Sequence, residues 1–528
     1  MGKVREGMRL APAGAVAGAV ALAALFLYVN KPFYHDDAYI SLRYARNLLA
    51  GDGLVWNPGE RVQGYTNFLH VGVVSLLGLA GADLVWASRA VGLGAYGALA
   101  LLALAGGWRL ARDESERALA WLPGVFVLAS CPLIVWALGG LEGTLLALLV
   151  WAGCVLFIAG VEDEGRGRGR LGGSGVCLAL ASLTRPDAVV FAGVAFLWLL
   201  AGYKNKKVPL GSLLAFAAPG LAIGGGYLAW QVGYYGDPVP NTFYAKASGF
   251  SWDRVLMGME YAVAYAARPP YLPLLAGAAG AWAAAAGRWT ARLSFLALCC
   301  GGYLAFIVFV GGDHMQAFRL MVPLVAPLGC IVWLSLAGLA GAPTRGAPAA
   351  RRWVAPAAAA GALALCGAQF FSKDLNPRRE DPASFVGTII GKHISRAWPA
   401  GSLVALNTAG STPYYASGHR YIDMLGLNDR HIARRRIEKI ELPWQRVPGH
   451  LKGDGAYVLD RRPDYIIVGR AEGTAISEPW FLSDLEMGRD PRFARDYVPR
   501  EVRLGPRGEV VAGGGIRFLY YQRLARQP

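Results

Sequence analysis

Long apolar segments, repeated along the first 370 residues, constrain this chain more than any other feature. Ala11–Val29 carries no charged residue, and a bilayer core of about 30 Å needs a helix of roughly 20 apolar residues. Further apolar segments lie at 68–84, 88–107, 118–138, 143–160, 172–184, 187–203, 208–230, 270–286, 292–311, 319–340 and 353–370. We therefore predict an all-α polytopic membrane bundle of about 11 to 12 apolar helices.

The composition excludes two common classes of protein. Of 528 residues, 55% are hydrophobic and 17% are charged, whereas soluble proteins average about 25% charged residues. The net charge of +16 would suit nucleic acid, but the basic residues form no stripe among aromatics and many lie in short loops between apolar segments. An ordinary cytosolic enzyme and a nucleic-acid-binding protein are both disfavoured.

The cysteines give no metal or disulfide pattern. All seven lie in or beside apolar segments, none forms a CxxC pair, and none follows Cys366. We expect no disulfide framework and no zinc site.

Basic residues predict the orientation of the bundle. Lys3, Arg5 and Arg9 precede the first segment, which favours a cytoplasmic start. A cleavable signal peptide is the rival interpretation, but many apolar segments follow and no clean cleavage site does. Four loops rich in Arg or Lys are placed in the cytoplasm by the positive-inside rule: Gly165–Arg170, Lys204–Lys207, Gly287–Arg292 and Thr344–Arg352.

Alternation from these four loops places the acidic motifs together on the extracytoplasmic face. That face then holds the loops 139–143, 184–187, 234–246 and 311–319, and everything after about residue 371. One conflict of parity remains, because two apolar segments separate Asp36 from Arg109–Arg117 where one or three are needed. We expect that one of the two does not cross fully.

The composition changes at Phe371, where the apolar segments end. Short β-like runs at Ser402–Leu406, Tyr465–Val468 and Ile516–Tyr521 alternate with charged stretches compatible with helices. We predict two domains: residues 1–370 form the transmembrane domain, with a first extracytoplasmic loop at 30–67, and residues 371–528 form a small extracytoplasmic α/β domain.

The first outer loop carries two adjacent carboxylates, Asp36 and Asp37. An amphipathic helix along the membrane surface, with one of these aspartates as N-cap, is the natural interpretation. The alternative to a catalytic role is that both aspartates only cap this helix and pair with Arg43. The positions that recur at helical spacing are Ile40, Tyr44, Asn47 and Leu48.

Three more outer loops carry ionisable residues next to apolar segments. Such groups at membrane depth cost at least about 2.5 kcal/mol, so each is a candidate for a site. The alternative is an interfacial end with satisfied salt bridges. The Arg185-Pro186 step is the most telling, because it interrupts a long apolar stretch. The residues are Glu142, Arg185, Asp187, Asp313, His314 and Arg319.

A fifth motif, Tyr234–Lys246, combines two prolines and two aromatic clusters with one lysine. The aromatics alone would be typical of a membrane-interface belt. Lys246 with Asn241 is also suited to a phosphate.

Taken together, these motifs resemble the GT-C class of membrane glycosyltransferases. The similarity lies in residues 35–67, 139–144, 183–188, 234–246, 311–324 and 407–433. It is strongest to the bacterial family that includes the mycobacterial terminal β-(1→2)-arabinofuranosyltransferase. The resemblance implies a helical bundle whose first outer loop bears the acidic pair, with polyprenyl-phosphate sugars as donors. Two positions depart from the family pattern, Gln63 and Glu142-Gly143-Thr144, and both leave the substrate open.

The chemistry of such a transfer gives each candidate a role. Asp36 or Asp37 is the general base, with Asp37 preferred, as the resemblance also implies; one carboxylate acting alone gives inversion. The groups expected to bind the donor phosphate are Arg185, Lys246, Arg319 and His314. The residues expected to bind sugar or acceptor are Glu142, Asp313, Tyr65, Asn67, Asn241 and Arg43. Any metal would be Mg²⁺ or Mn²⁺ held by oxygens, with Glu142 and Asp313 as candidates.

We therefore expect a multi-pass enzyme of the bacterial inner membrane. It would move arabinofuranose or another pentose or hexose from a polyprenyl-phosphate donor to a cell-envelope glycan or lipid on the extracytoplasmic face. One alternative is a transporter or flippase of lipid-linked sugars, although no paired halves correspond. Another is a non-catalytic envelope assembly factor, for which Asp423 and Asn428 would matter more than Asp37.

Overall fold

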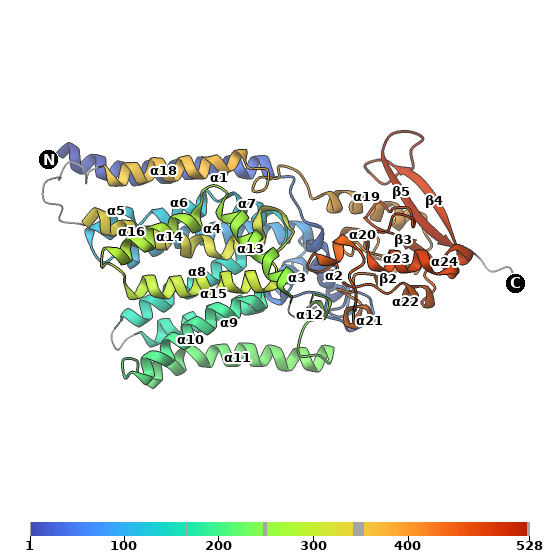
Figure 1. Ribbon diagram of the computed structural model, residues 1–528, viewed down its shortest axis with the longest axis horizontal. Coiled ribbons are helices and arrows are strands. Elements are labelled where there is room, and N and C mark those ends of the chain that lie inside the picture. The colour runs from blue at the N-terminus through green and yellow to red at the C-terminus, as the bar shows by residue number, and fades with distance from the viewer. Residues whose placement is uncertain (1, 164–166, 247–250, 342–352, 525–528) are drawn as a thin grey trace.

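The chain forms a helical bundle with a mixed α/β domain at one end (Figure 1). The computed structural model describes residues 2–163, 167–246, 251–341 and 353–524. The first half of the bundle contains α1 (Gly2–Asn30), α2 (Asp36–Leu49), α3 (Phe68–Leu79), α4 (Leu84–Leu110), α5 (Glu114–Leu119), α6 (Leu122–Leu128), α7 (Cys131–Leu138), α8 (Gly143–Glu162) and α9 (Arg168–Thr184). The second half contains η1 (Pro186–Ala188), α10 (Val189–Lys204), α11 (Leu210–Tyr235), α12 (Asn241–Lys246), α13 (Trp252–Ala266), α14 (Leu272–Ala285), α15 (Ala291–Val310), η2 (Gln316–Leu324), α16 (Val325–Gly341), α18 (Val354–Ala368) and η3 (Gln369–Phe371).

Every predicted apolar segment is helical, but fewer of them span a membrane than expected. Among the described residues, eight helices are long and apolar enough to cross, or nine if the bent pair Glu114–Leu128 and Cys131–Leu138 is one span. This bent pair turns by 45°, where the Ser130 side chain caps α7 and Pro132 follows. The prediction of a polytopic helical bundle is confirmed, with eight or nine spans in place of 11 to 12.

The short helix α3 resolves the conflict of parity. It has 12 residues, about 18 Å of helix, which is too short for a bilayer core of about 30 Å. Only α4 therefore crosses between Asp36 and the Arg109–Arg117 region, and α2 and α5 lie at opposite ends of the bundle (Figure 1). The expectation that one of the two segments does not cross fully is confirmed.

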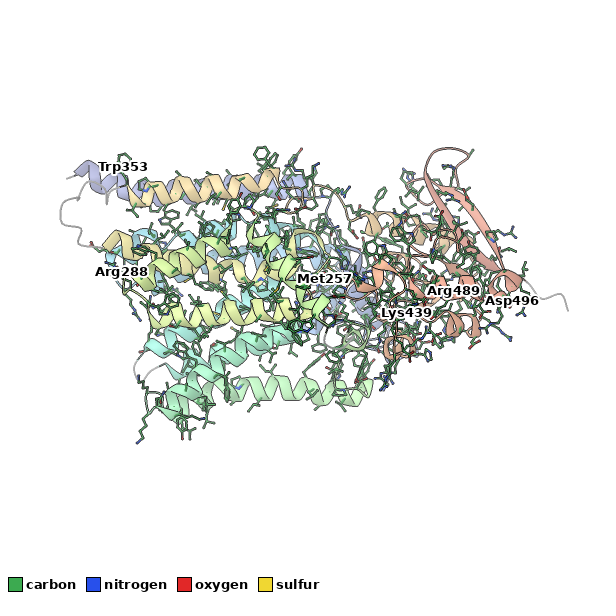
Figure 2. The ribbon with its side chains drawn as sticks, in the orientation of Figure 1. Met257, Arg288, Trp353, Lys439, Arg489 and Asp496 are labelled. Atoms are coloured by element: carbon green, nitrogen blue, oxygen red, sulfur yellow. The ribbon has the colours of Figure 1, made fainter. Side chains whose placement is uncertain are left out.

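Two of the basic loops lie together at one end of the bundle (Figure 1). The Lys204–Lys207 and Gly287–Arg292 loops lie at the end that also holds the N-terminus, away from the α/β domain (Figure 1). Arg288 and Trp353 mark this end in Figure 2, and Lys439, Arg489 and Asp496 lie at the other. Thr344–Arg352 and part of Gly165–Arg170 lie outside the described residues.

The C-terminal region folds around one five-stranded sheet of order β2-β1-β3-β5-β4. β1 pairs in parallel with β2 and β3, whereas β5 pairs antiparallel with β3 and β4. The strands are β1 (Leu403–Leu406), β2 (Arg420–Asp423), β3 (Tyr465–Ile467), β4 (Tyr497–Leu504) and β5 (Ile516–Arg523). The helices are α19 (Pro382–Ala397), α20 (Ser411–Tyr415), α21 (Arg430–Arg434), η4 (Pro443–Arg446), α22 (Gly455–Asp460), α23 (Leu482–Arg489) and α24 (Pro491–Asp496).

Alternation along the strands buries both faces of this sheet. Val404 and Leu406 face a core that includes residues of α19, while Ala405 belongs to a second core with residues of α21, α22 and α23. The first core is continuous with that of the bundle. The α/β domain is therefore packed directly onto the bundle end where the predicted site residues lie.

Candidate active site

The N-terminus of α2 holds the acidic pair, but neither aspartate caps it. His35 is the N-cap, and its Nδ1 accepts a hydrogen bond from the Asp37 backbone N–H at 3.2 Å. The predicted aspartate cap is therefore wrong. The predicted helix forms, yet ten of its 14 residues are buried, so it does not lie open along a membrane surface.

Asp36 is held by the C-terminal domain. Its Oδ1 accepts hydrogen bonds from the Ser411 backbone N–H at 2.8 Å and from the Ser411 hydroxyl at 2.6 Å. Burial raises the pKa of Asp36 to about 6, although the bonds from Ser411 lower it. The carboxylate of Asp36 thus joins α2 to α20.

Asp37 has a different environment. Its side chain is half-buried, and within the described residues its carboxylate accepts no hydrogen bond and forms no ion pair. Burial lowers the pKa of three basic side chains, Lys246, His314 and His450, and the negative charge of Asp37 partly offsets this lowering in each. Asp37 is therefore the aspartate that faces a group of basic side chains with its oxygens uncommitted.

Two carboxylate–arginine networks lie beside this group. Arg319 donates to Asp313 Oδ2 from Nη2 at 2.8 Å and from Nε at 3.0 Å, and His314 Nδ1 is 3.6 Å from Asp313 Oδ1. Burial alone would raise the pKa of Asp313, but Arg319 and His314 hold it well below its ordinary value. Arg319 also lies over the Trp136 ring, at 5.8 Å from its centroid.

The second network is centred on Arg185. Its Nη1 donates to Glu142 Oε1 at 3.0 Å, and its Nε donates to Asp187 Oδ1 at 3.1 Å. Burial would raise the pKa of Glu142, but Arg185 and Arg319 outweigh it and lower this pKa to about 2. Asn67 donates to the other oxygen of Glu142 at 3.0 Å, so these loops form one satisfied network, as the alternative of satisfied salt bridges expects.

Lys246 is the last residue of the short helix α12. Among the described residues, its ammonium group forms no ion pair with a carboxylate. Its side chain is accessible to solvent. Desolvation by the surrounding protein lowers its pKa and Arg319 lowers it further, whereas Asp37 and Asp313 raise it. Lys246 is thus a cation with free donors beside Asp37.

One residue of this group was missed by the sequence analysis. His450, from the loop after η4, places its ring 5.1 Å from that of His314, and its buried Nδ1 has no hydrogen-bond partner among the described residues. Burial and the neighbouring His314 lower the pKa of His450 to about 4. No local signal marks this isolated histidine, because only the docking of the two domains brings it here. We call this set the Asp37 cluster: Asp37, Lys246, Asp313, His314, Arg319 and His450.

Three predicted sugar- or acceptor-binding residues lie elsewhere. The Arg43 guanidinium donates to the carbonyls of Trp56, Pro413 and His419. The Asn241 amide donates to the carbonyls of Gly426, Leu427 and Asp429. The Tyr65 hydroxyl lies 3.1 Å from that of Tyr235. Arg43 and Asn241 therefore join the bundle to the C-terminal domain, and Tyr65 packs within an aromatic group.

The acidic side chains of the site do not form a metal centre. Across 2–163, 167–246, 251–341 and 353–524, no group of three or more His, Cys, Asp or Glu side chains is arranged to hold a metal ion. Glu142 and Asp313, the predicted candidates, each already bind an arginine. These two residues do not fit a metal site as they stand.

Comparisons with known proteins agree with this architecture. Two curated relatives, both named terminal beta-(1->2)-arabinofuranosyltransferase, come from Corynebacterium glutamicum and Mycobacterium tuberculosis. The first is 30% identical over 57% of this chain and 47% of its own length, and the second is 28% identical over 56% and 52%. The chain thus spans about half the length of these relatives.

The solved structures decide the fold. ArnT from Cupriavidus metallidurans in the apo state aligns with a TM-score of 0.52 and 16% identity, covering 78% of this chain and 85% of that one. This chain has a GT-C-like fold. The arabinofuranosyltransferase AftD from Mycobacteria aligns with a TM-score of 0.50 and 16% identity over 97% of this chain and 40% of that one. Residues 380–511 of this GT-C-like protein also match a domain of unknown function, DUF8728.

Proposed function

We propose that the protein is a membrane glycosyltransferase that moves a sugar from a polyprenyl-phosphate donor to a cell-envelope glycan or lipid. The observation that carries the proposal is the uncommitted Asp37 carboxylate beside Lys246, at the domain end of a GT-C-like bundle. The names of the two curated relatives favour arabinofuranose as the sugar.

The reaction requires a base for the acceptor and cations for the departing phosphate. Asp37 takes the proton from the acceptor hydroxyl while the oxygen of that hydroxyl bonds to the anomeric carbon. The bond from that carbon to the phosphate oxygen breaks, and the Lys246 ammonium stabilises the negative charge that develops on the departing phosphate. Arg319 and Arg185, each already paired with carboxylates, add positive potential and hold Asp313 and Glu142 in place.

Inversion in a single displacement is part of this proposal. A double displacement would need a second carboxylate free to attack the sugar. Three other predicted site carboxylates are committed, since Asp36 accepts two bonds from Ser411 and both Glu142 and Asp313 bind arginines. Asp37 is then the carboxylate available for the reaction.

The proposed face of the membrane is extracytoplasmic. The basic Lys204–Lys207 and Gly287–Arg292 loops lie at the opposite end of the bundle from the Asp37 cluster (Figure 1). The positive-inside rule puts those loops in the cytoplasm, which leaves the cluster and the C-terminal domain outside.

Release of free polyprenyl phosphate tests the function directly. The purified protein is incubated with polyprenyl-phosphate arabinofuranose and a panel of other polyprenyl-phosphate sugars, with a membrane extract as the source of acceptor. Asp37→Asn should lower the release rate on the order of 10²- to 10⁴-fold, because the general base is lost. Asp36→Asn should lose less than Asp37→Asn, and Asp52→Asn, on an exposed part of the same loop, is the matched control.

The possible outcomes separate the alternatives. Equal release by wild type and Asp37→Asn would show that the base is elsewhere. Absence of release with every donor would overturn the enzyme assignment in favour of transport or an assembly role.

A further inference from the structure

A basic cavity lies apart from the Asp37 cluster. It has a volume of about 770 Å³ and is formed between residues 60–62 of the first loop and the α21–α22 region of the C-terminal domain. It shares no lining residue with the Asp37 cluster. Five arginines line it: Arg61, Arg430, Arg434, Arg435 and Arg461.

The carboxylates of this cavity are already bound by the protein. Glu60 accepts from the Asn57 amide at 3.1 Å and pairs with Arg420 at 3.3 Å. Asp429 accepts from the backbone N–H of His431 at 2.9 Å and of Ile432 at 3.0 Å. Asp454 accepts from the Tyr457 backbone N–H at 2.9 Å and lies 3.0 Å from His431 Nε2. The three acids therefore leave an excess of positive charge in the cavity.

Two of the arginines supply that excess. Arg61 lies with its guanidinium 4.8 Å from the centroid of the Tyr234 ring. Arg430 donates from Nη2 to the carbonyls of Tyr235 at 2.8 Å and of Arg61 at 3.2 Å. Both side chains are exposed, and neither pairs with a carboxylate in the described part of the chain. Two guanidinium groups without a carboxylate partner thus line the same cavity.

The remaining arginines are partly committed. Arg434 pairs with Asp237, and Arg435 binds both oxygens of Glu486, at 2.6 and 2.7 Å. Arg461 donates to the Tyr457 hydroxyl at 2.7 Å and is 3.9 Å from Glu60. They frame the cavity, while Arg61 and Arg430 carry the free guanidinium donors.

The position of the cavity relative to the membrane indicates which class of ligand it binds. Tyr234 and Tyr235, which contact Arg61 and Arg430, are the last two residues of α11, and α11 is long and apolar enough to span. Arg61 and Arg430 therefore lie where α11 leaves the hydrocarbon core, which is the level of lipid phosphates. A planar guanidinium matches the oxygens of a phosphate with two parallel hydrogen bonds.

We propose that this cavity is an accessory phosphate-binding site, in which Arg61 and Arg430 bind a phosphate group from either a phospholipid headgroup at the membrane surface or a soluble phosphate. The site holds its ligand without taking part in bond breaking. Its occupancy neutralises the paired arginines where the first loop meets the C-terminal domain.

Binding measurements with two probes test the site and separate the two sources. In one arm, inorganic phosphate is titrated into the detergent-purified protein by calorimetry. In the other, the protein is reconstituted in nanodiscs of phosphatidylcholine alone or with phosphatidylglycerol, and retained lipid is counted by native mass spectrometry. Saturable binding of phosphate points to the soluble source, and selective retention of phosphatidylglycerol points to the headgroup.

Variants assign the binding to the cavity. Arg61→Gln should weaken binding about tenfold and the double variant Arg61→Gln/Arg430→Gln further, because charge-assisted bonds to phosphate are lost. Arg61→Gln is informative even if Arg430→Gln disturbs folding, since the Arg61 guanidinium donates no hydrogen bond to the described protein. Arg517→Gln, whose arginine pairs with Glu501 on the distant β4–β5 ribbon, is the control for charge.

Two results would overturn the inference: no binding of either probe by the wild-type protein, or binding by Arg61→Gln and the double variant equal to that of Arg517→Gln. The comparison of Arg61→Gln with Arg517→Gln measures binding alone, so the test does not depend on the proposed transferase activity.

Discussion

At the scale of single residues, the adjacent side chains of Asp36 and Asp37 lie in different environments. Asp36 points to Ser411 of the C-terminal domain and accepts two hydrogen bonds there. Asp37, one position along, keeps its oxygens free and faces Lys246, His314 and His450. Because consecutive side chains on a helix project about 100° apart, one turn of backbone serves both domain docking and the proposed chemistry.

Asp36→Asn should stabilise the protein at neutral pH. Burial raises the pKa of Asp36 from 3.8 to about 6, so the folded protein binds more protons than the unfolded chain between these values. The contribution of the Asp36 side chain to the free energy of unfolding is fully present below about pH 4 and is lost as pH rises through about 6. An asparagine at this position still offers an oxygen that accepts the hydrogen bonds from Ser411, and it does not ionise. The variant therefore avoids the loss of stability, which is up to about 3 kcal/mol.

Thermal unfolding of both proteins, followed across the acid-to-neutral range, measures this difference. The advantage of Asp36→Asn should grow as pH rises. A variant that is less stable than wild type by the same margin at every pH would show that the charge of Asp36 is needed for docking.

At the scale of elements, the short helix α2 is the connection between bundle and α/β domain. Arg43 and Arg46 of α2 donate to the carbonyls of Pro413 and Tyr414 in α20, and Asp36 binds Ser411 at the start of α20. The same docking brings His450 beside His314. The position of the C-terminal domain on α2 therefore sets the geometry of the Asp37 cluster.

Gly410→Ala should separate these two elements. A Cβ at Gly410 would overlap the backbone oxygen and the carboxylate of Asp36, so α20 has to move away from α2. We expect a destabilisation of about 1–3 kcal/mol and a loss of transferase activity of about 10²-fold, because shifts of this size misplace reacting groups.

Gly418→Ala is the matched control, since a Cβ there meets open space and should change stability by less than about 0.5 kcal/mol. Unfolding curves and donor-turnover rates for both variants provide the measurement. Equal activity of the two variants would show that the site does not depend on this contact.

At the scale of the whole molecule, the two ends of the bundle carry different groups of residues. One end carries the basic Lys204–Lys207 and Gly287–Arg292 loops, and the other carries the Asp37 cluster and the α/β domain (Figure 1). The short α3 gives the chain a path in which all outer motifs meet at one end. We propose that the end with these basic loops faces the cytoplasm.

Labelling of single introduced cysteines in intact cells checks this orientation. Lys439→Cys on the α/β domain should react with a membrane-impermeant maleimide, whereas Lys207→Cys, in the loop between α10 and α11, should react only after the cells are lysed. Both positions are exposed, and native background is low because six of the seven cysteines are buried. The reverse pattern would place the Asp37 cluster on the cytoplasmic side.

The sequence by itself determined the helical bundle, the change to an α/β fold after residue 370, and the gathering of acidic motifs at one end. These follow from local properties, because a bilayer selects each apolar segment by its own length and each loop by its own charge. Counting segments predicted that one of the two between Asp36 and Arg109 does not cross fully, and the structure identifies it as α3.

Only the tertiary structure decided which residues belong to the site. It tied Asp36 to Ser411, 375 positions away, and turned Arg43 and Asn241 into contacts between domains. It also brought His450 to His314. Hydrogen-bond partners and burial depend on contacts between segments far apart in the chain, and no periodicity or charge pattern within a segment records which distant group will meet it.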